Sequence, residues 1–273
     1  MSRIAAAFQK IRAEKRKALI PFIVCGDPNV QATVSLALTL FEAGADLLEI
    51  GVPFSDPSAE GPVIQRADAR ALAQGVRLDD VLTVVRAIRM KTNRPILLLS
   101  YYNVLYAAGL NQVFQTLQEA GVDGVIIPDL PVEERPEAAG PASEAGIDLI
   151  PLVSPLSGSR IPMIVNQASG YVYAVSALGV TGERAELSSG LEDYTKAIRA
   201  ATDLPLAFGF GIHSPEQVRA LRVFGDGMIV GSAIVRRIEE QAAAGASTEE
   251  ICTVVYDYLH VLRTALDEGS DQT

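Results

Sequence analysis

Eight short apolar segments recur along this chain, and patterns typical of helices separate them. Each segment is too short for a helix, and most are apolar on both faces, which is typical of buried parallel strands. We expect strands over residues 19–25, 46–52, 95–101, 124–129, 148–154, 171–176, 205–210 and 227–231. Strands that alternate with helices predict one closed (β/α)8 barrel, a TIM barrel of the α/β class. A doubly wound open sheet is the alternative.

Helical patterns cover residues 29–44, 78–92, 111–121, 191–202, 214–224 and 233–244. An extra amphipathic helix is expected within residues 1–17, with Ile4, Phe8 and Ile11 on one face. A helix over 247–269 should pack on the barrel and bury Ile251, Val254, Val255, Tyr258 and Val261. No linker divides the chain, so we expect a single domain over residues 1–273, with 270–273 as a tail.

The charge balance excludes several classes of partner. The 273 residues include 33 acidic and 23 basic side chains, a net charge of -10, which disfavours binding to nucleic acid or an anionic membrane. The N-terminus lacks the apolar core of a signal peptide, and no segment is long enough to cross a membrane. Two cysteines indicate a reducing cytoplasm, and two histidines are too few for a usual zinc site.

A short phrase repeats where a helix should end and a strand should begin. It reads Glu-Ala-Gly-x-Asp at residues 42–46, 119–123 and 144–148. Its glycine suits the left-handed conformation that ends a helix, so the next strand should begin at once.

Several carboxylates fall where barrel active sites lie, at the carboxyl ends of strands. Alternation along residues 47–51 directs Glu49 into the barrel, where burial should raise its pKa. A buried structural glutamate is the plainer alternative. The long loop that follows carries Asp56 and Glu60, and Asp129 ends a later strand. Each of these three side chains could equally be a cap or a solvated acid, whereas two carboxylates across a pocket could serve as acid and base.

The last three strands are followed by glycines. Segments 179–182, 209–211 and 231–232 combine close backbone approach with a helix start near residue 233, as a phosphate site requires. No lysine ends a strand, which disfavours a Schiff-base aldolase, and no His/acid cluster suggests a metal-dependent one. The residues therefore predict acid–base chemistry on a phosphorylated small molecule.

Specific motifs carry a family resemblance. Segments 49–57 (EIGVPFSDP) and 61–65 (GPVIQ), with 101–103 (YYN), 127–131 (IPDLP), 179–182 (GVTG) and 209–211 (GFG), resemble the alpha subunit of tryptophan synthase. The resemblance runs from about residue 3 to residue 240. It implies a TIM barrel and a carbon–carbon lyase of tryptophan biosynthesis, which cleaves indole-3-glycerol phosphate to indole and glyceraldehyde 3-phosphate. It also implies that no metal or cofactor is held by this chain. The implied partner is a beta subunit, which carries pyridoxal phosphate and assembles as alpha2beta2.

The resemblance also implies roles for individual residues. Glu49 matches the general acid/base, Tyr173 the tyrosine beside it, and Glu60 the position of the second catalytic carboxylate. The positions that match substrate-binding residues are Phe22, Ile64, Leu99, Tyr101, Ile126, Asp129, Thr181 and Phe210. The positions that match the phosphate cradle are Gly182, Gly211, Gly231 and Ser232. Asp56 and Pro57 lie in the segment that faces the beta subunit.

Three positions depart from the family pattern. Glu60 replaces an aspartate, Ser58 a leucine and Val24 a threonine. The longer Glu60 would have to be fitted by a shifted loop, or activity would be reduced or redirected. A regulatory subunit with little lyase activity, a stand-alone indole-releasing lyase, and more remotely another phosphate-binding barrel such as an epimerase stay open as alternatives.

Overall fold

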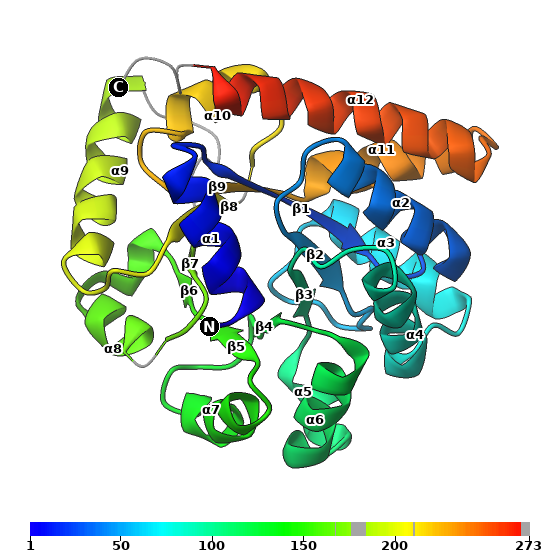
Figure 1. The fold of residues 1–273 in the computed structure, drawn as a ribbon, viewed down its shortest axis with the longest axis horizontal. Helices are drawn as coiled ribbons and strands as arrows, with labels where there is room; N and C mark the ends of the chain where they lie inside the picture. Colours follow the sequence, from blue (N-terminus) through cyan, green and yellow to red (C-terminus); the bar gives the residue numbers. More distant parts are fainter. Residues whose placement is uncertain (167, 176–183, 210, 269–273) are drawn as a thin grey trace.

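The fold comes from a computed structural model that describes residues 1–166, 168–175, 184–209 and 211–268, and only the backbone of 184–189. Each of the eight predicted strand segments forms parallel β-structure (Figure 1). The strands are β1 (Ala18–Val24), β2 (Leu48–Gly51), β3 (Ile96–Leu99), β4 (Gly124–Ile126), β5 (Asp148–Ile150), β6 (Leu152–Val153), β7 (Val172–Val175), β8 (Leu206–Gly209) and β9 (Gly227–Val230).

Pro151 divides the fifth predicted strand into β5 and β6, because proline has no N–H to continue the hydrogen-bond ladder. The order around the sheet is β5-β4-β3-β2-β1-β9-β8-β7-β6. β5 pairs with β4 and β6 pairs with β7, so the sheet returns to its starting point and forms a nearly closed barrel. The predicted TIM-barrel fold is confirmed, and the open-sheet alternative is wrong.

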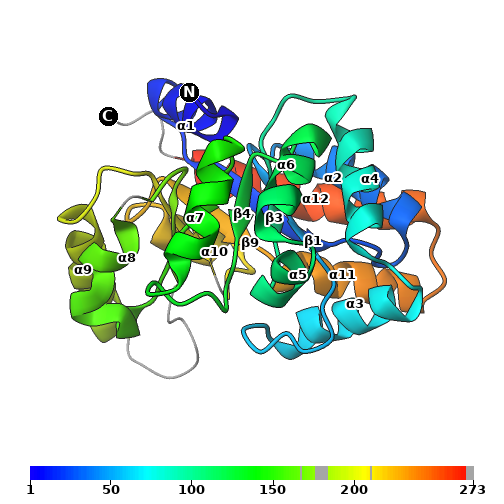
Figure 2. The same ribbon diagram turned by 90° about the horizontal axis from the view of Figure 1, so that it is seen from below.

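Helices surround the barrel, as two perpendicular views show (Figures 1 and 2). They are α1 (Arg3–Ala13), α2 (Val30–Glu42), α3 (Pro62–Ala73), α4 (Leu78–Arg89), α5 (Tyr102–Ala107), α6 (Leu110–Ala120), α7 (Arg135–Glu144), α8 (Ile161–Val165), α9 (Arg184–Arg199), α10 (Pro215–Leu221), α11 (Ser232–Ala243) and α12 (Thr248–Asp267), with a 3-10 helix η1 (Pro155–Arg160). The predicted N-terminal helix is present as α1, and its Ile4, Phe8 and Ile11 are buried.

Two helical predictions need correction. α9 begins at Arg184, well before the predicted residue 191, because the helix continues through the polar residues around Gly190. In α12 the buried face contains Ile251, Val255, Leu259 and Leu262. Val261, which was expected to pack, is 51% exposed, because the helical repeat turns it away from that face.

The repeated Glu-Ala-Gly-x-Asp segments lie at the amino ends of strands. The three glycines, Gly44, Gly121 and Gly146, have φ values of 108°, 94° and 70°, which confirms the predicted left-handed helix ends. Two of the aspartates tie neighbouring strands together: Asp46 accepts the N–H of Leu19 (3.0 Å) and Asp123 accepts that of Ile96 (2.8 Å). The aspartates at this end of the barrel therefore stabilise the pairing of neighbouring strands.

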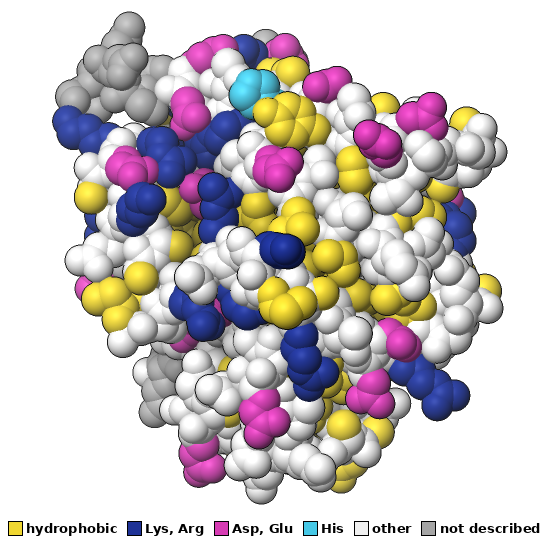
Figure 3. Space-filling view, turned by 45° about the vertical axis from the view of Figure 1, so that its right-hand side comes forward, with side chains coloured by type: hydrophobic (Ala, Val, Ile, Leu, Met, Phe, Trp, Pro, Cys, Tyr) yellow, Lys and Arg dark blue, Asp and Glu magenta, His cyan; other side chains and the backbone are white. Residues whose placement is uncertain are grey.

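Basic side chains lie among acidic ones on the face shown in Figure 3. None of the helices in the described ranges is both long and apolar enough to cross a membrane. Within the same ranges, no three His, Cys, Asp or Glu side chains come together as metal ligands.

Candidate active site

The carboxyl ends of the strands surround a cavity of about 880 Å³. Its lining includes eight of the residues predicted for the site: Phe22, Glu60, Ile64, Leu99, Tyr173, Gly211, Gly231 and Ser232. They come from distant parts of the chain, and the parallel barrel brings them to one mouth. Part of the predicted apolar wall, one carboxylate and part of the predicted phosphate cradle therefore share one cavity.

Glu49 lies inside the barrel, as strand alternation predicts. It pairs in register with Phe22, a lining residue, and its side chain is 0% exposed. The hydroxyl of Tyr171 donates a hydrogen bond to Glu49 Oε1, whereas Oε2 is buried and has no hydrogen-bond partner among the described residues. Burial raises the pKa of Glu49 to about 8; the Tyr171 hydrogen bond opposes the rise, and the charge of Glu60 adds to it.

Two tyrosines, not one, flank this carboxyl group. Tyr173, which was predicted for the site, lines the cavity, whereas Tyr171, which was not predicted, donates a hydrogen bond to Glu49. Tyr171 immediately precedes β7 and Tyr173 lies within it, so the period of two along the predicted strand could have found both. Tyr173 fits because Gly209 has no side chain: a Cβ there would lie 2.5 Å from the Tyr173 hydroxyl.

The loop that carries Glu60 is held at several points. The Tyr101 hydroxyl accepts the N–H of Ala59 (2.9 Å), and the Tyr101 ring stacks on Phe54 with centroids 4.8 Å apart. Burial raises the pKa of Glu60 to about 7. Asp68 of α3, unnoticed in the sequence, is buried close by, and burial together with the charge of Glu60 raises its pKa to about 8. Three carboxyl groups with raised pKa values therefore gather on one side of the barrel mouth.

Another part of the cavity wall suits an anion. α11 begins at Ser232 without a side-chain cap, and the Ile234 N–H donates to the Gly231 carbonyl (2.8 Å), so within the described ranges the N–H groups of Ser232 and Ala233 are available to an anion. Gly211 adopts a φ of 78° beside it. Arg236, one turn into α11, also lines the cavity; it was not predicted, because the sequence does not show which face of a helix borders a cavity.

Other predicted residues lie elsewhere. Ile126 and Tyr101 are buried and do not line the cavity. Asp129 is exposed and outside the lining; its carboxylate instead accepts the N–H of Tyr102 (2.8 Å) at the start of α5. In the loop, Asp56 is exposed whereas Pro57 is buried. Thr181, Gly182, Phe210 and the tail 270–273 lie outside the described residues.

The fold and the cavity together define a class of protein. A buried glutamate and a second carboxylate, both with pKa values near neutrality, can donate and accept protons at physiological pH. The helix start at Ser232, without a side-chain cap and in the lining of the same cavity, can bind a phosphate. The chain is thus a TIM-barrel enzyme equipped for acid–base chemistry on a phosphorylated substrate.

Comparison with known proteins identifies the family. The family model for the tryptophan synthase alpha chain matches residues 8–260. The tryptophan synthase alpha chain of Thermoanaerobacter sp. (strain X514) is 43% identical over 266 residues, covering 97% of this chain and 100% of that protein. That of Synechococcus elongatus is 45% identical over 250 residues, with 91% and 94% covered. The chain belongs to the tryptophan synthase alpha chain family, which confirms the predicted lyase family of tryptophan biosynthesis.

Solved structures agree. The alpha subunit of tryptophan synthase from Legionella pneumophila str. Paris superimposes with a TM-score of 0.90 at 38% identity, covering 98% of this chain and 99% of that one. A chain of tryptophan synthase from M. tuberculosis, in an open form with BRD0059 bound, gives a TM-score of 0.87 at 31% identity, with 98% and 100% covered. The fold is therefore similar over nearly the whole chain.

Proposed function

We propose that this chain cleaves indole-3-glycerol phosphate to indole and glyceraldehyde 3-phosphate, with Glu49 as general acid/base. The observation that carries the proposal is the state of Glu49. It is fully buried at the barrel mouth, hydrogen-bonded to Tyr171, and has a pKa raised to about 8 by burial. Near neutral pH such a group holds a proton that it can deliver and then take back.

The reaction needs two proton transfers. Glu49 donates its proton to the indole carbon that carries the side chain, and it then accepts the proton of the adjacent side-chain hydroxyl. The carbon–carbon bond breaks as the new aldehyde forms, and its electron pair returns to the indole ring. Atoms balance without water or cofactor. Phe22, Ile64 and Leu99 supply the apolar wall for the ring.

Glu60 serves as the second carboxylate. When ionised it accepts a hydrogen bond from the indole N–H and stabilises the positive charge that develops on the ring nitrogen. Its place in the cavity lining and the anchoring of Ala59 by Tyr101 support this role. Tyr173 lies near both glutamates, whose charges contribute to a pKa well above its usual value after burial, so it acts as a neutral hydrogen-bonding group.

The phosphate of the substrate binds at the start of α11. Gly231, Ser232 and Gly211 are the described members of this cradle, and Thr181 and Gly182 are expected to complete it beside Phe210. Arg236 adds a positive charge to an otherwise neutral set of N–H donors.

The chain is also expected to work with a beta subunit in an alpha2beta2 assembly in the cytoplasm. Pyridoxal phosphate belongs to that partner, and this chain needs no cofactor. Several of the similar solved structures are described as tryptophan synthase, without restriction to one subunit, which supports an assembly of this kind. Asp56 is exposed at the loop and is the residue of its pair that we expect to contact the partner.

A steady-state assay of the full chain with indole-3-glycerol phosphate, with and without a beta subunit, tests the proposal. We expect indole and glyceraldehyde 3-phosphate in equal amounts, and faster turnover with the beta subunit. No indole under either condition would favour the regulatory alternative. Full turnover that no beta subunit changes would favour a stand-alone lyase.

A further inference from the structure

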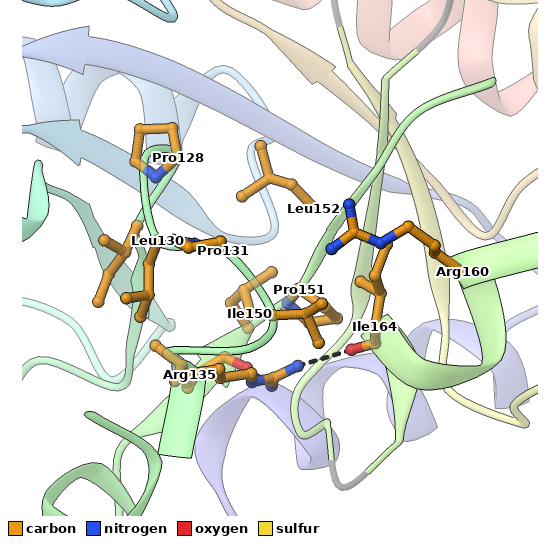
Figure 4. Close-up of a pocket in the computed structure, with 12 residues that line it drawn as sticks. Pro128, Leu130, Pro131, Arg135, Ile150, Pro151, Leu152, Arg160 and Ile164 are labelled. Atoms are coloured by element: carbon orange, nitrogen blue, oxygen red, sulfur yellow. Dashed lines mark hydrogen bonds between the residues drawn. The ribbon is translucent and has the colours of Figure 1, made fainter. Parts of the chain in front are cut away.

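A second, smaller cavity of about 200 Å³ lies beside the substrate cavity. Its lining consists of seven aliphatic side chains, three prolines and two arginines (Figure 4). One wall is the segment between β4 and α7, and the other is formed by β5, β6 and α8. Pro128 and Leu152 line both cavities, so the two are neighbours with shared walls.

Arg135 brings a positive charge to this apolar cavity. Its two terminal nitrogens donate to the carbonyls of Leu149 (2.8 Å) and Ile164 (2.7 Å), so two of its five N–H groups are occupied. Within the described ranges, no carboxylate pairs with this guanidinium. Burial lowers the pKa of Arg135, because no negative charge nearby in these ranges offsets the loss of hydration of its guanidinium. The remaining three N–H groups have no acceptor in the described part of the chain and are available to an anion.

Arg160 stands at the mouth of the same cavity. Its guanidinium pairs with Glu133 (2.5 Å), and both side chains are more than half exposed. This ion pair joins the two walls, and Figure 4 shows the Arg160 guanidinium turned toward Leu152. An exposed pair of this kind contributes little to stability, so an incoming anion can replace Glu133 at small cost.

We propose that this cavity binds a small carboxylate with a flat apolar body, held by Arg135 and Arg160. A carboxylate matches the planar fork of a guanidinium, and the rest of the lining is aliphatic side chains and prolines, with no hydroxyl group. The volume limits the ligand to the size of one aromatic ring with its acid group. Three prolines make the walls stiff, which lowers the entropy cost of binding. Such a ligand would contact Pro128 and Leu152, which also line the substrate cavity.

Calorimetric titration of the full chain with benzoate, and with its neutral analogue benzamide, tests the site. We expect benzoate to bind with a Kd of about 1 mM, as suits so small a ligand, and benzamide at least about tenfold more weakly. Equal affinity for the two probes would overturn the proposal, because the charge would then have no role.

Variants locate the bound benzoate. Arg160→Gln should weaken binding about fivefold with unchanged Tm, and Leu130→Phe should abolish it by filling the cavity. Arg135→Lys should weaken binding about tenfold by removing the planar guanidinium, although this variant also loses the hydrogen bonds to the carbonyls of Leu149 and Ile164.

Arg236→Gln, in the substrate cavity, is the matched control and should leave benzoate binding intact. Benzoate binding that depends on Arg236 and not on Arg160 would place the anion in the substrate cavity and contradict the proposal. No step needs lyase activity, so the test is independent of the proposed function.

Discussion

Both ends of the barrel bury carboxyl groups, but the groups at the two ends have different partners. At the amino end Asp123 is 5% exposed and pairs with Arg3 and Arg89 (both 2.7 Å), besides accepting the N–H of Ile96. At the carboxyl end Glu49 is 0% exposed and has one neutral donor, Tyr171. A buried carboxylate that is paired with arginines, such as Asp123, holds neighbouring strands together. A buried carboxyl group without a cationic partner, such as Glu49, has a raised pKa and can exchange protons. The difference separates the stabilising end of the barrel from the reactive end.

The largest effect is expected at Glu49. Glu49→Gln keeps the shape and the acceptor for Tyr171 but cannot carry a proton, so kcat should fall about 1,000-fold or more while substrate affinity changes little. Single-turnover kinetics and calorimetric binding of substrate measure the two quantities separately. An unchanged kcat would show that Glu49 is a structural glutamate.

At the opposite end, Asp123→Asn should destabilise the fold without affecting chemistry. It leaves Arg89 partly buried without a counter-ion, which typically costs about 3 kcal/mol. Urea denaturation measures the loss, and kcat of the folded protein should stay the same. Glu268→Gln, which breaks an exposed pair with Arg219, is the control and should leave the midpoint unchanged. Equal midpoints for the two variants would remove the contrast between the ends.

The raised pKa of Glu49 also predicts a dependence of stability on pH. The folded pKa of about 8 exceeds the usual 4.5, so the folded state keeps a proton that the unfolded chain loses. Stability is therefore lost as pH rises from about 4.5 to 8. Glu49→Gln should raise Tm by on the order of 5 °C at pH 8.5 and by much less at pH 5.5. The exposed Glu119→Gln should show no such trend; a constant difference for Glu49→Gln would argue against the raised pKa.

The smallest effect concerns the residue that departs from the family pattern. Ala59 is fixed by Tyr101, so the backbone at Glu60 cannot easily advance toward the substrate. Glu60→Asp would withdraw the carboxylate by one methylene, and we expect kcat to fall about tenfold. A rise would show instead that Glu60 is a strained substitute. The matched change Glu240→Asp, at another cavity-lining glutamate on α11, should leave kcat unchanged.

The sequence predicted the parts of the molecule that follow from periodicity and local signals. All eight strands and the inward direction of Glu49 belong to this class. α7 was missed because Pro136 and Pro141 obscure its helical pattern. Contacts between residues on different strands could not be predicted from local patterns. The hydrogen bond from the Tyr102 N–H to Asp129, for example, depends on the pairing of β3 with β4.

The pH dependence of kcat/KM tests the central claim most directly, because it reports the ionisation of the free enzyme. Glu60 must be ionised and Glu49 protonated, so the profile should be a narrow bell. Its apparent pKa values should be about 7 and 8, and they belong to the coupled pair. A profile that stays level to pH 9, with a single acidic limb near the ordinary value of a glutamate, would contradict the account.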